Sequence, residues 1–138
     1  MSEVNSSTIA AISTALSESG IGIIRVSGPD AVSVCSNILF DAKGNRVLDS
    51  MDASTFRHLY VKDGEESVDE CIVLLYRAPH SYTGEDIVEI QCHGGIFLLK
   101  KVLDLVIKNG AVHAMPGDRK STRLNSSHSG QSRMPSSA

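Results

Sequence analysis

One stretch of the chain constrains the fold more than any other: residues 86–110, which read DIVEIQCHGGIFLLKKVLDLVIKNG. The first seven residues alternate as a β-strand does. After Gly94 and Gly95, polar residues recur at spacings of three and four, and apolar residues cover most of the rest, which predicts an amphipathic helix over 96–110. Because a strand and a one-sided apolar helix must both be buried against other elements, this stretch requires a sheet with a helix packed on it.

The remaining predicted elements are mostly strands. Short apolar runs bounded by Gly, Ser or Pro are typical of strands, and the Pro that follows Ser27 and Gly28 marks the start of a short helix. Strands with two helices between some of them predict an α+β domain with a mixed sheet and two main helices. The predicted elements are strands at 8–15, 20–28, 55–62, 67–78 and 86–92 and another from 111, a helix at 30–39, a turn at 16–20 and a hairpin turn at 62–65.

The composition bounds the kind of protein. A chain of 138 residues is long enough for one domain with a core. Its net charge of −3 does not favour autonomous nucleic-acid binding. The apolar runs are shorter than the about 18 residues that a membrane span needs, and the N-terminus lacks the regions of a signal peptide, so we expect no membrane association and a cytoplasmic protein. The three cysteines form no CxxC and the histidines show no ligand spacing, so we expect buried, reduced thiols and no metal site.

Two charged residues stand inside otherwise apolar strands. Glu89 shares one face of its predicted strand with Ile87, Gln91 and His93, and Arg25 is the only charge in GIGIIRVSG. For each charge the pattern leaves two explanations open, a solvated sheet face and the polar wall of a ligand pocket. If the two strands are neighbours, the opposite charges indicate a shared site or a mutual ion pair.

The block SYTGEDIVEIQCHGG, with GIGIIRVSGPDA before it and an apolar helix and Pro-Gly after it, closely resembles the N-terminal domain of the MnmE/TrmE family of tRNA-modification GTPases. The resemblance covers residues 8–117. It implies a tetrahydrofolate-binding fold like that of the glycine-cleavage aminomethyltransferases, which binds 5-formyltetrahydrofolate and forms a homodimer. Arg25 and Glu89 match the folate contacts of the family. The resemblance implies no catalytic residue within this domain.

Intact members of the family also carry a helical domain and a Ras-like G domain. The resemblance implies that they bind GTP, Mg²⁺ and K⁺, and that with an FAD-containing partner, MnmG/GidA, they modify the wobble uridine of certain tRNAs. This chain has no GxxxxGK[ST] phosphate loop and no C-terminal Cys motif of that family. We therefore expect a truncated fragment that is not catalytic alone.

The C-terminal segment departs from the family. After Pro116 and Gly117, a family segment that carries a further basic folate contact is replaced by DRKSTRLNSSHSGQ. Residues 118–138 contain seven serines among 21 residues, so we expect disorder there and in residues 1–7, with one folded domain over 8–117. Two alternatives remain open from the sequence: a stand-alone folate-dependent one-carbon transferase, and a pure protein-interaction module.

Overall fold

The computed structural model describes residues 8–14, 21–78 and 84–114. Its elements are β1 (Ile9–Thr14), β2 (Gly22–Ser27), α1 (Ala31–Ser36), β3 (Leu39–Phe40), the 3₁₀ helix η2 (Leu48–Ser50), β4 (Thr55–Asp63), β5 (Glu66–Tyr76), β6 (Ile87–Cys92), α2 (Ile96–Lys108) and β7 (Val112–His113). Within these ranges the strands form one seven-stranded sheet in the order β3-β4-β5-β6-β2-β1-β7. Paired strands are antiparallel except β1 and β7, which are parallel. The predicted α+β domain with a mixed sheet is confirmed.

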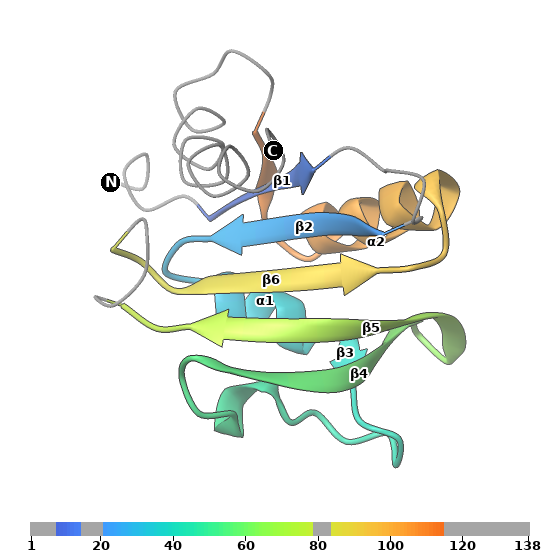
Figure 1. Ribbon diagram of the computed structural model, residues 1–138, viewed down its shortest axis with the longest axis horizontal. Coiled ribbons are helices and arrows are strands. Elements are labelled where there is room, and N and C mark those ends of the chain that lie inside the picture. The colour runs from blue at the N-terminus through green and yellow to red at the C-terminus, as the bar shows by residue number, and fades with distance from the viewer. Residues whose placement is uncertain (1–7, 15–20, 79–83, 115–138) are drawn as a thin grey trace, which may run out of the picture.

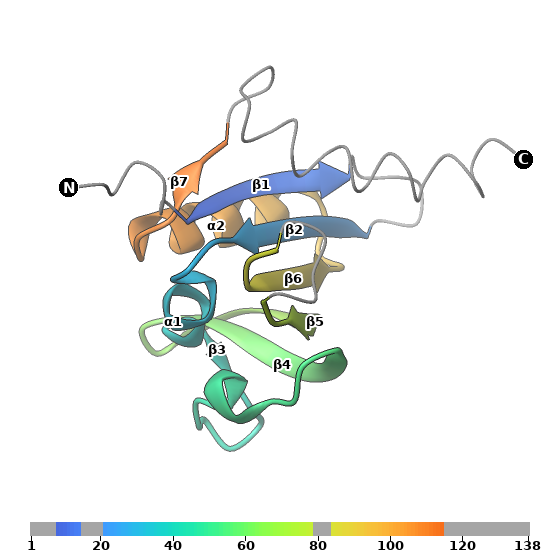
Figure 2. The same ribbon diagram turned by 90° about the vertical axis from the view of Figure 1, so that its left-hand side faces the viewer.

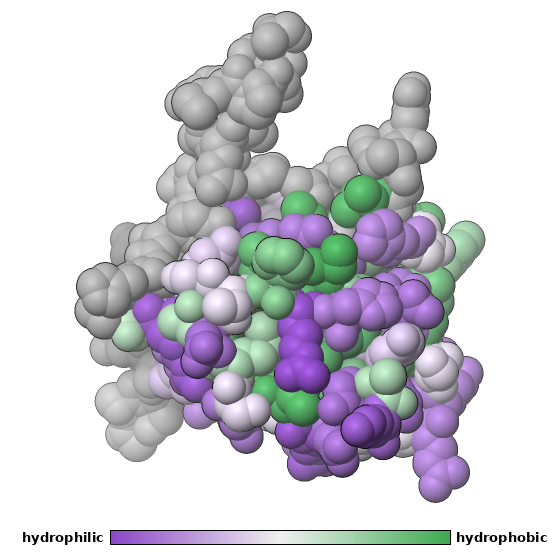
Figure 3. All heavy atoms as spheres, turned by 60° about the horizontal axis from the view of Figure 1, so that its bottom comes forward, coloured by the Kyte–Doolittle hydropathy of each residue, from purple (hydrophilic) through white to green (hydrophobic). Residues whose placement is uncertain are grey.

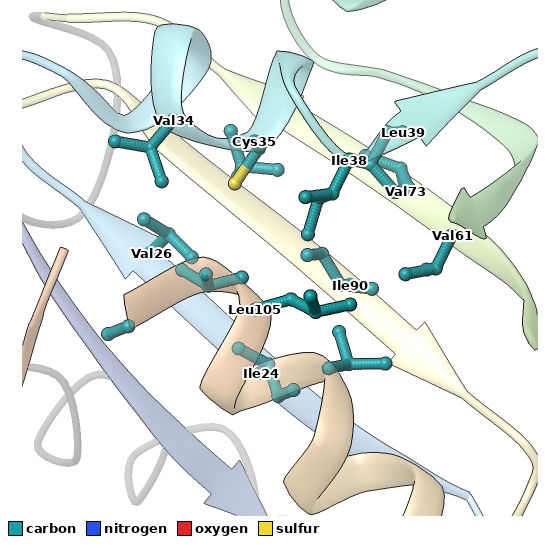
Figure 4. Packing of buried hydrophobic residues seen from close by; sticks show 14 of the residues in the cluster. Ile24, Val26, Val34, Cys35, Ile38, Leu39, Val61, Val73, Ile90 and Leu105 are labelled. Carbon is teal, nitrogen blue, oxygen red and sulfur yellow. The ribbon is translucent and has the colours of Figure 1, made fainter. Parts of the chain in front are cut away.

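Both α-helices lie on one face of the sheet (Figures 1 and 2). Alternate side chains of the strands point toward these helices and form a single buried cluster with them (Figure 4). Val26 of β2 and Val34 of α1 belong to this cluster, together with Val88, Ile90 and Cys92, the side of β6 predicted to be core. The burial of this layer is the main apolar contribution to folding.

Glycines begin and follow α2. A Cβ atom at Gly94 would overlap the side chain of Leu98, whose Cγ and Cβ would lie 3.0 and 3.1 Å away. Gly95 is the N-cap with φ of 94°, and Gly110 follows the helix with φ of 127°, both in the region that favours glycine. The adjacent glycines are therefore required for a tight exit from β6 into the helix.

The structure differs from the sequence prediction around α1. The helix was predicted over 30–39 but spans only Ala31–Ser36, because Leu39 and Phe40 pair with Val61 and Tyr60 of β4 as the short strand β3. Neither β3 nor η2 was predicted. The predicted turn at 16–20 and the predicted disorder at 1–7 and 118–138 fall outside the described residues.

The β4–β5 hairpin agrees with its prediction. The turn falls at Gly64 and Glu65, between Asp63 and Glu66, and Gly64 has φ of 67°. Leu59 of β4 is buried on the helix side, whereas alternate residues of the same strand face the solvent. The surface that faces the viewer in Figure 3 carries hydrophilic and hydrophobic residues side by side.

Candidate functional site

The strand register brings the two predicted site residues together. β2 and β6 are neighbours in the middle of the sheet, and Arg25 pairs directly with Glu89. Gly28 N donates to Asp86 O at 3.0 Å in the same ladder. Because hydrogen-bonded and non-hydrogen-bonded pairs alternate along antiparallel strands, Arg25 and Glu89 fall on a non-hydrogen-bonded pair, where facing side chains come closest.

Both residues lie on the side of the sheet away from the two α-helices. We call this side the face opposite α1 and α2. Its residues in the three central strands are Ile23, Arg25 and Ser27 of β2, Ile87, Glu89 and Gln91 of β6, and Glu70, Ile72, Leu74 and Tyr76 of β5.

The carboxylate of Glu89 is held at both oxygens. Arg25 Nε donates to Oε1 at 3.0 Å, and Gln91 Nε2 donates to Oε2 at 3.1 Å. Arg25 is 2% exposed and Glu89 5% exposed, whereas Gln91 is half-buried. Of the alternatives left open by the sequence, the solvated face is therefore wrong for these two charges, and a mutual ion pair is present.

A buried ion pair needs more than its own attraction. Removing two charges from water costs several kcal/mol for each ion, and the pair offsets this cost only when further hydrogen bonds satisfy it. Gln91 supplies one such bond. An ionised carboxylate has about four acceptor positions, so the bonds from Arg25 and Gln91 leave Glu89 with capacity to accept from a ligand.

A pocket of about 460 Å³ opens on the same sheet, beside the pair rather than at it. Its lining includes Ile72, which pairs directly with Gln91, and His93, two residues further along the chain. Arg25 and Glu89 are not part of the lining. Gln91 does not line the pocket either, and along the chain it lies between Glu89 and the lining residue His93.

The acidic residues before β6 have anchoring roles. Asp86 accepts hydrogen bonds from Ala78 N at 2.9 Å and from Arg77 Nη1 at 3.3 Å, which ties the start of β6 to the end of β5. Ser27 Oγ donates to Glu85 Oε1 at 3.2 Å, which adds a link to β2. None of these bonds was predicted from the sequence.

Sequence reasoning also missed the role of Gln91. Its position two residues after Glu89 placed both side chains on one face, and that spacing was the signal that could have found it. A polar residue on a strand face is more often solvated, so the pattern alone did not separate the two cases.

The cysteines provide no nucleophile. Cys35, Cys71 and Cys92 are buried free thiols, as predicted. Burial raises the pKa of Cys92 to about 12 and raises the pKa values of Cys35 and Cys71 as well. A thiol must ionise to attack or to bind a metal, so these three are structural.

The described ranges contain neither a candidate metal site nor a membrane-spanning helix. In them no group of three or more His, Cys, Asp or Glu residues is arranged to hold a metal ion. No helix among the described residues is long and apolar enough to cross a membrane.

The α+β domain with a central buried ion pair has close relatives. The family described as the N-terminus of the GTP-binding protein TrmE matches residues 8–122, and this chain belongs to that family. Among curated relatives, the tRNA modification GTPase MnmE of Caldicellulosiruptor saccharolyticus is 48% identical over 111 residues, covering 80% of this chain and 24% of the relative. The protein of the same name from Bacteroides thetaiotaomicron is 48% identical over 115 residues, covering 83% of this chain and 24% of the relative. The chain thus spans about a quarter of the length of these relatives.

Proposed function

We propose that this domain binds 5-formyltetrahydrofolate at the Arg25–Glu89 pair and serves as the N-terminal, homodimer-forming module of a tRNA wobble-uridine modification GTPase. The observation that carries the proposal is the pair itself. Two opposite charges are buried in the middle of a sheet, joined at 3.0 Å, on the face that no α-helix of the described ranges covers. The family membership supplies the module and its context.

The chemistry of the ligand suits the pair. A pterin ring offers a ring N–H and an amino group side by side, and both can donate to acceptors such as the Glu89 carboxylate. The folate tail is anionic and suits the guanidinium of Arg25. The fold itself is proposed to be of the aminomethyltransferase-like, tetrahydrofolate-binding kind.

The wider context is proposed from the family. The intact protein would bind GTP with Mg²⁺ and K⁺ in a separate G domain and would act on tRNA with an FAD-containing partner of the MnmG/GidA type, in the cytoplasm. The relatives are named as tRNA modification GTPases, and this chain aligns with only 24% of their length. We propose that the residues present here bind the folate and catalyse nothing alone.

Calorimetric titration of 5-formyltetrahydrofolate tests the proposal. Glu89→Gln replaces an acceptor-only group by an amide that carries donors, and a hydrogen bond to a charged group contributes roughly 1.5–3 kcal/mol. We expect affinity to fall by about ten- to a hundredfold. The protein is kept at high concentration because the further basic contact of the family has no counterpart in this chain.

The matched control is Glu66→Gln. Glu66 is exposed, lies outside the lining of the pocket, and meets Lys101 Nζ at 3.9 Å, so the same chemical change there should alter affinity less than about twofold. Circular dichroism verifies that each variant is folded. Absence of binding by the wild type, or equal binding by Glu89→Gln, would contradict the proposal. Sedimentation equilibrium of the wild type tests the homodimer.

A further inference from the structure

We propose that Gln91 is a specificity-determining residue of this site: it orients the Glu89 carboxylate through Nε2 and presents its own amide oxygen to the amino group of the ligand. This inference rests on the proposed folate function and deepens it. The resemblance matched only Arg25 and Glu89 to ligand contacts, whereas the geometry adds Gln91 through its bond to Glu89.

The orientation of the amide follows from its partner. An ionised carboxylate can only accept hydrogen bonds, so the Gln91 atom 3.1 Å from Glu89 Oε2 must be the nitrogen. The carbonyl oxygen is then directed away from Glu89. Within the described part of the chain, no group donates to that oxygen, so it remains available to accept.

Gln91 is also the first polar group of the cluster that an incoming ligand meets. It is half-buried, whereas Arg25 and Glu89 are almost completely buried. Ile72 and His93, which flank it, line the pocket of about 460 Å³. That volume lies within the range of roughly 300–1,000 Å³ that is typical of small-molecule sites. Gln91 is not itself part of the lining, so a flat heterocycle that contacts Gln91 and Glu89 would extend from this pocket across the face of β6.

This arrangement selects one chemical class of ligand. Glu89 and Gln91 together offer two neighbouring acceptors, which match a fused heterocycle with a ring N–H beside an exocyclic amino group. An analogue with a carbonyl in place of that amino group would set one acceptor against another. A site built around such a hydrogen bond rejects the analogue strongly, because its own buried polar groups are then left unpaired.

The test is a competition experiment with pterin and lumazine, which differ by an amino group against a carbonyl at one ring position. The affinity of each heterocycle is measured by its displacement of 5-formyltetrahydrofolate from the wild type, from Gln91→Met and from Ile72→Val. We expect the wild type to prefer pterin by about tenfold or more. Met has a similar length but neither donates nor accepts in the same way, so Gln91→Met should reduce the preference to about twofold.

Ile72→Val is the matched control, since it alters the packing beside Gln91 without touching a hydrogen bond. It should weaken the binding of both heterocycles alike and leave the ratio of their affinities unchanged. If Gln91 had a purely structural role, Gln91→Met would give the same result. An unchanged ratio in Gln91→Met, or no preference in a wild type that binds 5-formyltetrahydrofolate, overturns the role of Gln91 and leaves the proposed function standing. A wild type that does not bind the folate overturns both.

Discussion

Substitutions of Arg25 and Glu89 should have non-additive effects on the free energy of unfolding of the domain. The pair is joined at 3.0 Å, and the two side chains are only 3% and 7% exposed. Removing one partner of such a pair leaves an uncompensated buried charge, which costs about 3–5 kcal/mol. Because domains of this size have a total free energy of unfolding of about 5–15 kcal/mol, Arg25→Met or Glu89→Leu alone should remove about a fifth of it or more.

The double variant, with Met at position 25 and Leu at position 89, should be far less affected. Apolar residues of similar volume often replace a buried ion pair at little or no cost, and the half-buried Gln91 can turn its amide to water. We expect the double variant to lie within about 1 kcal/mol of the wild type. It should therefore be at least about 5 kcal/mol more stable than the sum of the two single changes would give.

Urea unfolding followed by circular dichroism measures the cycle. With a slope of about 1–3 kcal/mol per molar urea, each single change should lower the midpoint by about 2 M, whereas the double variant should return close to the wild-type midpoint. A single variant that fails to fold agrees with the prediction only if the double variant folds. Additive effects, or single changes below about 1 kcal/mol, would refute the coupling.

Two other predictions concern the core and the entry to α2. The buried thiols are those of Cys35, Cys71 and Cys92. They should resist Ellman's reagent at pH 8 in the native protein and all react in guanidinium, and a fast native reaction would contradict their burial. Burial raises the pKa values of these thiols in the folded state, so their contribution to stability should be constant below about pH 8.5. It should fall as pH rises toward about 12, the pKa of Cys92, by up to about 1.4 kcal/mol for each thiol and each pH unit. Gly94→Ala should cost about 1–3 kcal/mol in the same urea assay, because its Cβ overlaps Leu98; Gly94→Ala together with Leu98→Ala should cost less than the sum of the separate changes.

Local patterns predicted the elements well. β5 was predicted over 67–78 and spans Glu66–Tyr76, and α2 was predicted over 96–110 and spans Ile96–Lys108. Alternation, helical spacing and glycines act over a few residues, so one sequence contains this information. The order of the strands and the short β3 could not be predicted, since they depend on partners far along the chain, such as Val61 for Leu39.

The site shows the same division between local and distant information. That Arg25 and Glu89 are lone charges in apolar strands is visible in the sequence. That they meet depends on the register of two strands whose facing residues lie 64 positions apart. The bond from Gln91 depends in turn on the position of Glu89, because an isolated amide on a strand has no reason to avoid water.

The position of β2 beside β6 has a kinetic consequence. The β4–β5 hairpin pairs residues as close along the chain as Asp63 and Glu66, whereas Arg25 and Glu89 in the β2–β6 ladder lie 64 positions apart. Pairing strands that are distant along the chain costs more loop-closure entropy before any contact forms. We therefore expect β4, β5 and β6 to assemble first and β2 to dock on them later. The two buried charges would then lose their water only in that late step. Sub-global opening of the native domain should begin at the same seam, so amide hydrogens along β2 should exchange faster than those of the β4–β5 hairpin.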